Sequence, residues 1–170
     1  DIQIGEADAE IPERRGLPKT QYSSRHVTQS AQALKAGKSA LLLGGPALSE
    51  AGIMLAGRIA AASSADLICD TFFARMERGG DLPAPIRLPY FPDQALELIR
   101  RYQHVIVVGT RRPVAFFGYP GLPSYLTTEV QTVMLSGPQD DTLGALAALA
   151  DEVNAAEDVR PSAGEFPVIP

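Results

Sequence analysis

The chain has 170 residues, 45% of them hydrophobic and 21% charged, which is typical of a globular protein with one well-filled core. Its net charge of −5 and its lack of a lysine and arginine cluster argue against a nucleic-acid partner, because phosphate backbones attract a basic surface. No apolar stretch approaches the roughly 20 residues of a membrane span.

The single cysteine, Cys69, excludes an intrachain disulfide and favours the reducing environment of the cytoplasm. The chain begins at Asp1 and not at a methionine, so we expect it to be a piece of a longer polypeptide.

Helical and strand patterns alternate in the first half of the chain. Residues 25–36 have a helical apolar period, and 38–45 is an apolar run that stops at two glycines, as expected of a strand buried on both faces. A second helix is predicted over 49–62, with Ser49 as its cap, and a second strand over 66–70. The apolar face expected of the second helix consists of Ala51, Leu55 and Ile59, flanked by Met54 and Ala62.

The second half begins with an irregular segment, 71–91, in which 72–78 has the composition of a short helical turn. Regular patterns then return, including a β-branched apolar run that ends in Gly109. The expected elements are a helix over 92–102, a strand over 104–110, a loop over 111–124, a strand over 130–135 and a helix over 142–153.

The alternation of strands and helices predicts a Rossmann-like α/β fold with three layers. We expect a mainly parallel sheet of five to six strands with helices on both faces. This domain should cover residues 25–155, between an N-terminal linker or arm over 1–24 and a C-terminal linker over 156–170.

Glycines and polar residues follow three of the predicted strands at their carboxyl ends, where ligands bind in open α/β sheets. The Gly44-Gly45 turn precedes a helix, and Asp70 lies about 25 residues further on, near the spacing of a ribose-binding acid. The turn lacks the G-x-G-x-x-G spacing, and Pro46 removes one N–H donor. Two interpretations therefore remain, a purely structural turn and a nucleotide site made of Gly44, Gly45, Asp70, Gly109 and Thr110.

No catalytic or metal-binding residue can be assigned from the sequence. His26 and His104, the only histidines, are far apart in the chain and lie near no cysteine or carboxylate pair at metal spacing. Ser39 and Ser124 stand outside any G-x-S-x-G elbow, so hydrolase chemistry has no support.

The loop over 111–121 combines Arg111-Arg112 with aromatic, proline and glycine residues at the end of a central strand. Aromatic residues on such a loop either anchor an interface or fold back onto the sheet. The sequence leaves both interpretations open and slightly favours the interface.

The run K-S-A-L-L-L-G-G at 38–45 and the run H-V-I-V-V-G-T-R-R-P-V-A-F-F at 104–117 carry a family resemblance. Together with the order of elements, they make residues 20–155 resemble the central domain of thiamine-diphosphate-dependent enzymes of the acetolactate synthase and benzoylformate decarboxylase type. The resemblance implies a parent enzyme in which this domain lies between a pyrimidine-binding and a diphosphate-binding domain.

In that family, thiamine diphosphate and Mg²⁺ lie between the outer domains of two subunits, which implies a homodimeric or homotetrameric parent. The chain contains no Gly-Asp-Gly motif for the diphosphate and Mg²⁺, so the resemblance implies that it has no catalytic activity alone. Some relatives bind FAD and carry Gly-Met-His-Gly where this chain has 88–92, which argues against FAD here. The alternative is a free-standing protein that binds a nucleotide of the FAD or NAD type.

Overall fold

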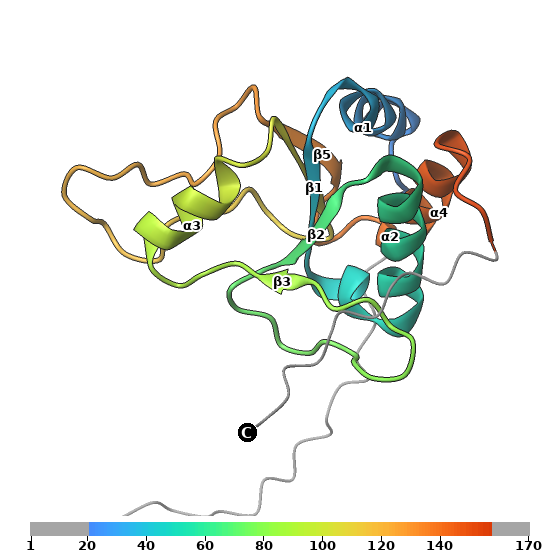
Figure 1. Cartoon of the computed structure of the whole chain (residues 1–170), viewed down its shortest axis with the longest axis horizontal. Helices are drawn as coiled ribbons and strands as arrows, with labels where there is room; N and C mark the ends of the chain where they lie inside the picture. The colour runs from blue at the N-terminus through green and yellow to red at the C-terminus, as the bar shows by residue number, and fades with distance from the viewer. Residues whose placement is uncertain (1–20, 158–170) are drawn as a thin grey trace, which may run out of the picture.

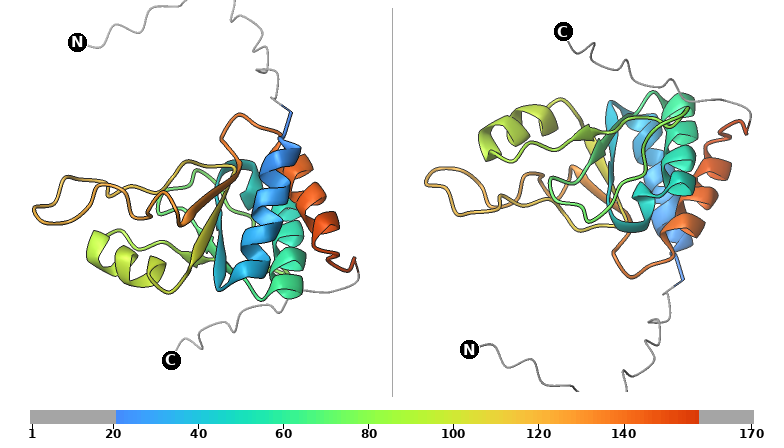
Figure 2. Two further views of the ribbon diagram at one scale, coloured as in Figure 1. Left: turned by 90° about the horizontal axis from the view of Figure 1, so that it is seen from above. Right: turned by 90° about the horizontal axis from the view of Figure 1, so that it is seen from below.

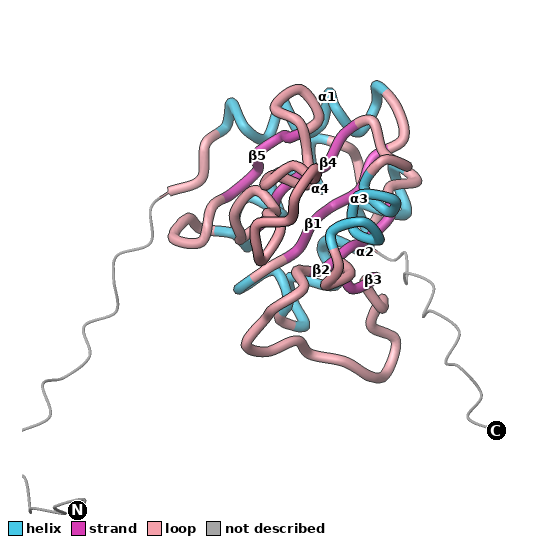
Figure 3. The backbone as a smooth tube through the Cα atoms, turned by 90° about the vertical axis from the view of Figure 1, so that its left-hand side faces the viewer, coloured by secondary structure: helices cyan, strands magenta, loops and turns pink. Residues whose placement is uncertain are grey.

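The structure, a computed structural model, describes residues 21–157. Five parallel strands form one sheet in the order β3-β2-β1-β4-β5, and Figure 3 shows them side by side in this order. The strands are β1 (Ser39–Leu43), β2 (Asp66–Cys69), β3 (Ile86–Arg87), β4 (His104–Val108) and β5 (Thr132–Ser136). The predicted α/β class with five to six parallel strands is therefore confirmed.

Strand β1 is the centre of the sheet, as its unbroken apolar run predicts. All five of its residues are buried, and its register pairs Leu42 with Val107 of β4 and with Ile68 of β2. A strand that is covered on both faces cannot alternate apolar and polar residues, which explains the continuous run.

Helices cover both faces of the sheet, and most of them lie on one side. Figures 1 and 2 show α1, α2 and α4 together on one face and α3 alone on the other. Two apolar clusters correspond to these layers: Leu41 and Ile106 pack under the three helices, whereas Leu42 and Val107 pack under α3. The helices are α1 (Ser24–Ala36), α2 (Glu50–Ser63), α3 (Pro92–Ile99) and α4 (Thr142–Glu152).

The buried face of α2 differs from the predicted one. Ala51 is exposed and Leu55 is half-buried, whereas Gly52, Ile53 and Ala56 are buried together with the correctly predicted Ile59. A short 3₁₀ helix, η1 (Gly45–Leu48), sets this rotation: a Cβ on Gly52 would lie 2.6 Å from the carbonyl oxygen of Ala47. Because α2 is apolar on almost every side, this close approach selects the buried face, which periodicity alone could not.

The irregular segment between β2 and α3 contains no helix, so the helical turn predicted over 72–78 is wrong. The segment instead follows the start of α2. The backbone N–H of Glu77 donates to the Leu48 carbonyl (3.0 Å), and its side-chain Oε2 accepts from the Glu50 N–H (2.6 Å). Bonding to another element thus replaces the local hydrogen bonds of a helix, and the segment ends in the two-residue strand β3.

The remaining element boundaries agree with the predictions within a few residues. Helix α3 ends at Ile99, three residues earlier than predicted. Beyond it, the N–H groups of Arg101 and Tyr102 donate to the carbonyls of Leu98 and Ile99 and form a tighter turn. No helix within residues 21–157 is long and apolar enough to cross a membrane. The linkers predicted over 1–24 and 156–170 lie almost wholly outside the described residues, and the boundaries of the domain stay predictions.

Candidate functional site

The carboxyl ends of β1, β2 and β4 bring the five predicted site residues together. Each strand is followed by a residue whose N–H extends the ladder by one more bond. The N–H of Gly44 donates to Val108 (2.9 Å), and that of Asp70 donates to Leu43 (3.1 Å). The N–H of Gly109 donates to Ser136, whose backbone carbonyl oxygen and side-chain hydroxyl oxygen both lie 3.0 Å from the Gly109 nitrogen. These three donors are therefore already bonded within the protein.

The two glycine turns pack backbone against backbone. Gly45 and Gly109 both have positive φ, +50° and +68°, which glycine adopts without the strain of other residues. A Cβ on Gly109 would lie 2.5 Å from the Gly44 carbonyl oxygen, and one on Gly45 would lie 2.9 Å from the Gly109 carbonyl oxygen. The glycines thus allow two loops to approach each other, and protein atoms fill the space beside them.

Asp70 and Thr110 form the polar part of the site across the end of β1. The Thr110 hydroxyl donates to the Asp70 Oδ2 at 2.5 Å, and a Cβ on Gly44 would lie within 2.7 Å of both side chains. Burial raises the pKa of the Asp70 carboxyl above its usual range, whereas the bond from Thr110 acts in the opposite direction. The carboxyl is thus partly withdrawn from water at the end of a central strand.

A cavity of about 190 Å³ opens beside Asp70 and Thr110. Arginine and aromatic side chains line it, among them Arg111, Arg112, Phe72, Tyr90 and Phe116. Sites that hold drug-sized ligands and cofactors usually have volumes of roughly 300–1,000 Å³. This cavity is therefore small for a whole dinucleotide, although its lining combines charge with aromatic surface.

The sequence did not reveal two features, one at the site and one at the opposite, amino-terminal edge of the sheet. Ser136, at the end of β5, is buried and holds the Gly109 turn through its hydroxyl. His26 and His104 both line a second cavity, of about 560 Å³, between α1 and β5, and His104 Nδ1 is buried there without a hydrogen-bond partner. Among residues 21–157, no group of three or more metal-ligating side chains comes together.

The raised pKa of Asp70 predicts how stability should change with pH. A carboxyl whose pKa is higher in the folded chain stabilises the fold most below its unfolded value, about 3.9, and this contribution is lost as pH rises through the folded pKa. Asp70→Asn keeps an oxygen that accepts from Thr110 but cannot ionise. Relative to the wild type, the variant should therefore gain stability between about pH 4 and pH 7.

Urea unfolding of both proteins across this pH range measures the effect. Thr110→Val, which removes the hydroxyl donor but leaves the carboxyl able to ionise, serves as the comparison. A stability difference between wild type and Asp70→Asn that stays the same at every pH would show that the carboxyl titrates at its ordinary value.

Comparison with known proteins relates this fold to a family. No family model matches the chain. Over 132 residues, or 77% of its length, the chain is 41% identical to the protein named "Putative acetolactate synthase large subunit IlvX" of Mycobacterium tuberculosis (strain ATCC 25618 / H37Rv). The resemblance to the acetolactate synthase type is thereby confirmed. The chain spans only 25% of the length of this acetolactate-synthase-like relative.

A solved structure agrees with this relationship at the level of the fold. It is described as the "X-ray structure of a putative thiamin diphosphate-dependent enzyme isolated from Mycobacterium smegmatis". The two structures superpose with a TM-score of 0.61, covering 91% of this chain and 32% of the other, at 21% sequence identity. In both comparisons, the chain matches a minority of a longer protein.

Proposed function

We propose that the chain is the central, non-catalytic domain of a larger thiamine-diphosphate-dependent enzyme of the acetolactate synthase type, in which it acts as a scaffold. One observation carries the proposal: 77% of the chain matches a relative at 41% identity, yet this match is only a quarter of that relative. The rest of the parent enzyme would supply the pyrimidine-binding and diphosphate-binding domains. The whole parent enzyme would act on a 2-keto acid in the cytoplasm, as a homodimer or homotetramer.

The donors at the carboxyl edge of the sheet support the scaffold role. A phosphate bound at such an edge needs free backbone N–H groups. Those of Gly44, Asp70 and Gly109 already donate to neighbouring strands, and Pro46 has none to offer. The edge is therefore built to hold the strands and loops in register.

The described residues also do not fit thiamine diphosphate or Mg²⁺. Mg²⁺ prefers several oxygen ligands in octahedral geometry, and no cluster of three acidic, histidine or cysteine side chains occurs within residues 21–157. The full sequence contains no Gly-Asp-Gly motif. In our proposal, both groups are held entirely by the flanking domains.

A nucleotide role for Gly44, Gly45, Asp70, Gly109 and Thr110 stays a prediction. Of these residues, the Asp70 carboxyl and the Thr110 hydroxyl line the open cavity, so they are the groups available to a ligand. Any nucleotide would have to bind through these side chains and the arginines beside them, and not through the N–H groups of Gly44 and Gly109, which already donate to neighbouring strands.

A thermal-shift panel on the 170-residue chain tests the proposed function. Thiamine diphosphate with Mg²⁺ should leave the unfolding midpoint unchanged, because the chain lacks the groups that hold them. FAD, NAD and ADP should also leave it unchanged. An intact enzyme of the acetolactate synthase type, run in parallel, should shift with thiamine diphosphate and Mg²⁺ and confirms that the ligands are active.

The possible shifts have distinct meanings. Stabilisation by thiamine diphosphate and Mg²⁺, confirmed by isothermal titration, would contradict the non-catalytic role. A shift with FAD, NAD or ADP that disappears in Asp70→Asn would instead favour the free-standing nucleotide-binding protein.

A further inference from the structure

The two loops at the carboxyl edge of the sheet expose a cluster of aromatic rings. We call Phe72, Tyr90, Phe91, Phe116 and Phe117 the aromatic patch. The rings contact one another, with centroids of Phe72 and Phe116 5.0 Å apart and those of Phe116 and Phe117 4.8 Å apart. Each is nevertheless 39% to 59% exposed. The chain has six phenylalanines and five tyrosines; the patch includes four of the phenylalanines and one tyrosine, and none of these five is placed in the core.

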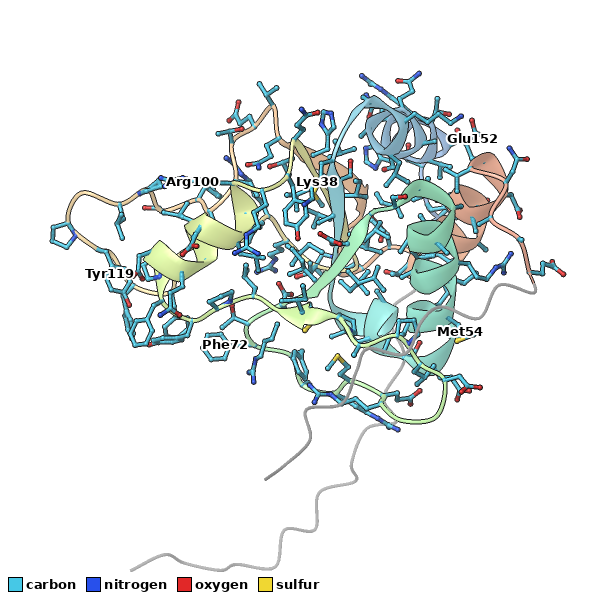
Figure 4. All side chains as sticks on the ribbon, viewed as in Figure 1. Lys38, Met54, Phe72, Arg100, Tyr119 and Glu152 are labelled. Atoms are coloured by element: carbon cyan, nitrogen blue, oxygen red, sulfur yellow. The ribbon has the colours of Figure 1, made fainter. Side chains whose placement is uncertain are left out.

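The patch lies on the side of the molecule that carries α3. In Figure 4, Phe72 lies on this side, away from α2 and α4. The neighbouring Val114 and Tyr125 are 55% and 53% exposed and are joined by an isolated antiparallel bridge, which continues the apolar surface along the second loop. The aromatic residues therefore do not fold back onto the sheet.

The exposed area is large for a monomer and suitable for a dimer. An aromatic side chain has a surface of roughly 150–250 Å². The five half-exposed rings, together with Val114 and Tyr125, therefore present roughly 600–700 Å² of apolar surface to solvent. The largest apolar patch of a typical monomer is about 300–600 Å². A standard interface buries about 800 Å² per partner, of which somewhat more than half is apolar. The patch alone supplies that apolar share.

Two of the arginines beside the patch, Arg87 and Arg112, bond within the chain, whereas Arg111 is exposed. Arg87 donates twice to the Thr71 carbonyl, at 2.8 and 2.6 Å, and its guanidinium lies over the Phe73 ring. Arg112 stacks 4.1 Å from the Tyr125 ring centroid and donates to the carbonyl of Thr127. These two arginines do not require an acidic partner, which favours a second apolar surface as the occupant.

We infer that the aromatic patch binds the same patch on a second copy of this chain, in a two-fold symmetric dimer. Such an interface needs a surface that complements itself. The patch meets this need because neighbouring rings lie nearly perpendicular, at 86° for Phe72 and Tyr90 and 82° for Phe116 and Phe117. It therefore presents both ring edges and ring faces, the two partners of T-shaped packing.

The net charge of −5 sets the expected response to salt. Two copies repel each other at long range, while the contact itself is apolar, so added salt should strengthen the dimer. An acidic partner drawn to the neighbouring arginines would instead be released by salt. This inference concerns the chain by itself and does not depend on the thiamine-diphosphate proposal.

Sedimentation equilibrium of the 170-residue chain, from about 1 to about 100 µM, tests the inference. The wild type should change from monomer to dimer across this range. Phe116→Ser combined with Phe117→Ser, and separately Phe72→Ser on the other loop, should each weaken association at least tenfold. Val130→Ser is the matched control, because Val130 is 89% exposed but precedes β5 at the opposite end of the sheet.

Thermal unfolding of each variant confirms that the fold is intact, as expected for changes at exposed positions. A wild type that stays monomeric at the highest concentration overturns the inference and assigns the patch to another occupant, such as a flanking domain. A dimer that Val130→Ser weakens as much as the patch variants, or that salt dissociates, also overturns it.

Discussion

Gly109→Ala should destabilise the fold by about 3 kcal/mol, because two independent costs meet at this position. The backbone of Gly109 has φ of +68°, which costs an L-residue about 1–2 kcal/mol. The new Cβ would also lie 2.5 Å from the Gly44 carbonyl oxygen and 3.0 Å from the Thr142 side chain. Since Gly44 and Thr142 belong to a buried strand end and a helix start, neither can move away freely.

Urea unfolding at fixed pH measures this loss, and Gly121→Ala is its matched control. Gly121 also has positive φ, +78°, but no atom lies within 4 Å of the Cβ position. Gly121→Ala should lower the free energy of unfolding by about 1 kcal/mol. This loss measures the cost of the positive φ alone, without the clash of the new Cβ. Equal losses in the two variants would show that the turns of β1 and β4 do not pack as closely as described.

Leu41→Ala and Leu42→Ala should each cost about 2–5 kcal/mol, although the two residues are adjacent in the chain. Leu41 packs beneath α1, α2 and α4, and Leu42 packs beneath α3, and both are fully buried. Truncating either one leaves a cavity in a different apolar layer. In a strand with one solvent-facing side, only one of the two substitutions would be costly.

Equilibrium unfolding of the two variants measures this prediction, with Ile86→Ala as the control. Ile86 is also a branched aliphatic residue in the sheet, but it is 49% exposed in the edge strand β3. Its truncation should cost less than about 1 kcal/mol. A small loss for Leu42→Ala would mean that α3 does not cover its side of the sheet tightly.

The sequence was most informative where a whole element obeys one rule. The apolar runs that end in Gly44 and Gly109 are typical of strands buried on both faces, and both lie in the interior of the sheet. The helical period over 25–36 was also informative, because Val27, Ala31 and Leu34 recur on one face of a mainly polar helix and all three are buried. In these cases, local chemistry and tertiary packing require the same structure.

The failures occur where contacts from distant residues decide the structure. Strand β3 has two exposed residues and no period of its own, and it exists because Ile86 pairs with Ile68 of β2. The segment 72–78 is held by Glu77 against the start of α2, a contact across 27 residues. Neither arrangement leaves a pattern within a short window of sequence.

The candidate site was predicted in part for the same reason. Placing Asp70 and Thr110 at the carboxyl ends of parallel strands follows from the strand predictions. Their direct bond across 40 residues depends on β2 and β4 flanking β1, and strand order is not encoded in local patterns. The side chains of Asp70 and Thr110 fill the space beside Gly44, and this follows only from the way the loops pack.

During synthesis, β1 and β2 leave the ribosome well before β4, which pairs with the other edge of β1. Ser39 of β1 pairs with His104 of β4, so the emerging chain carries its most apolar strand with one unpaired edge until residue 108 has followed. Unpaired apolar edges recruit strands from other chains. The nascent chain is therefore most exposed to misassembly in this interval.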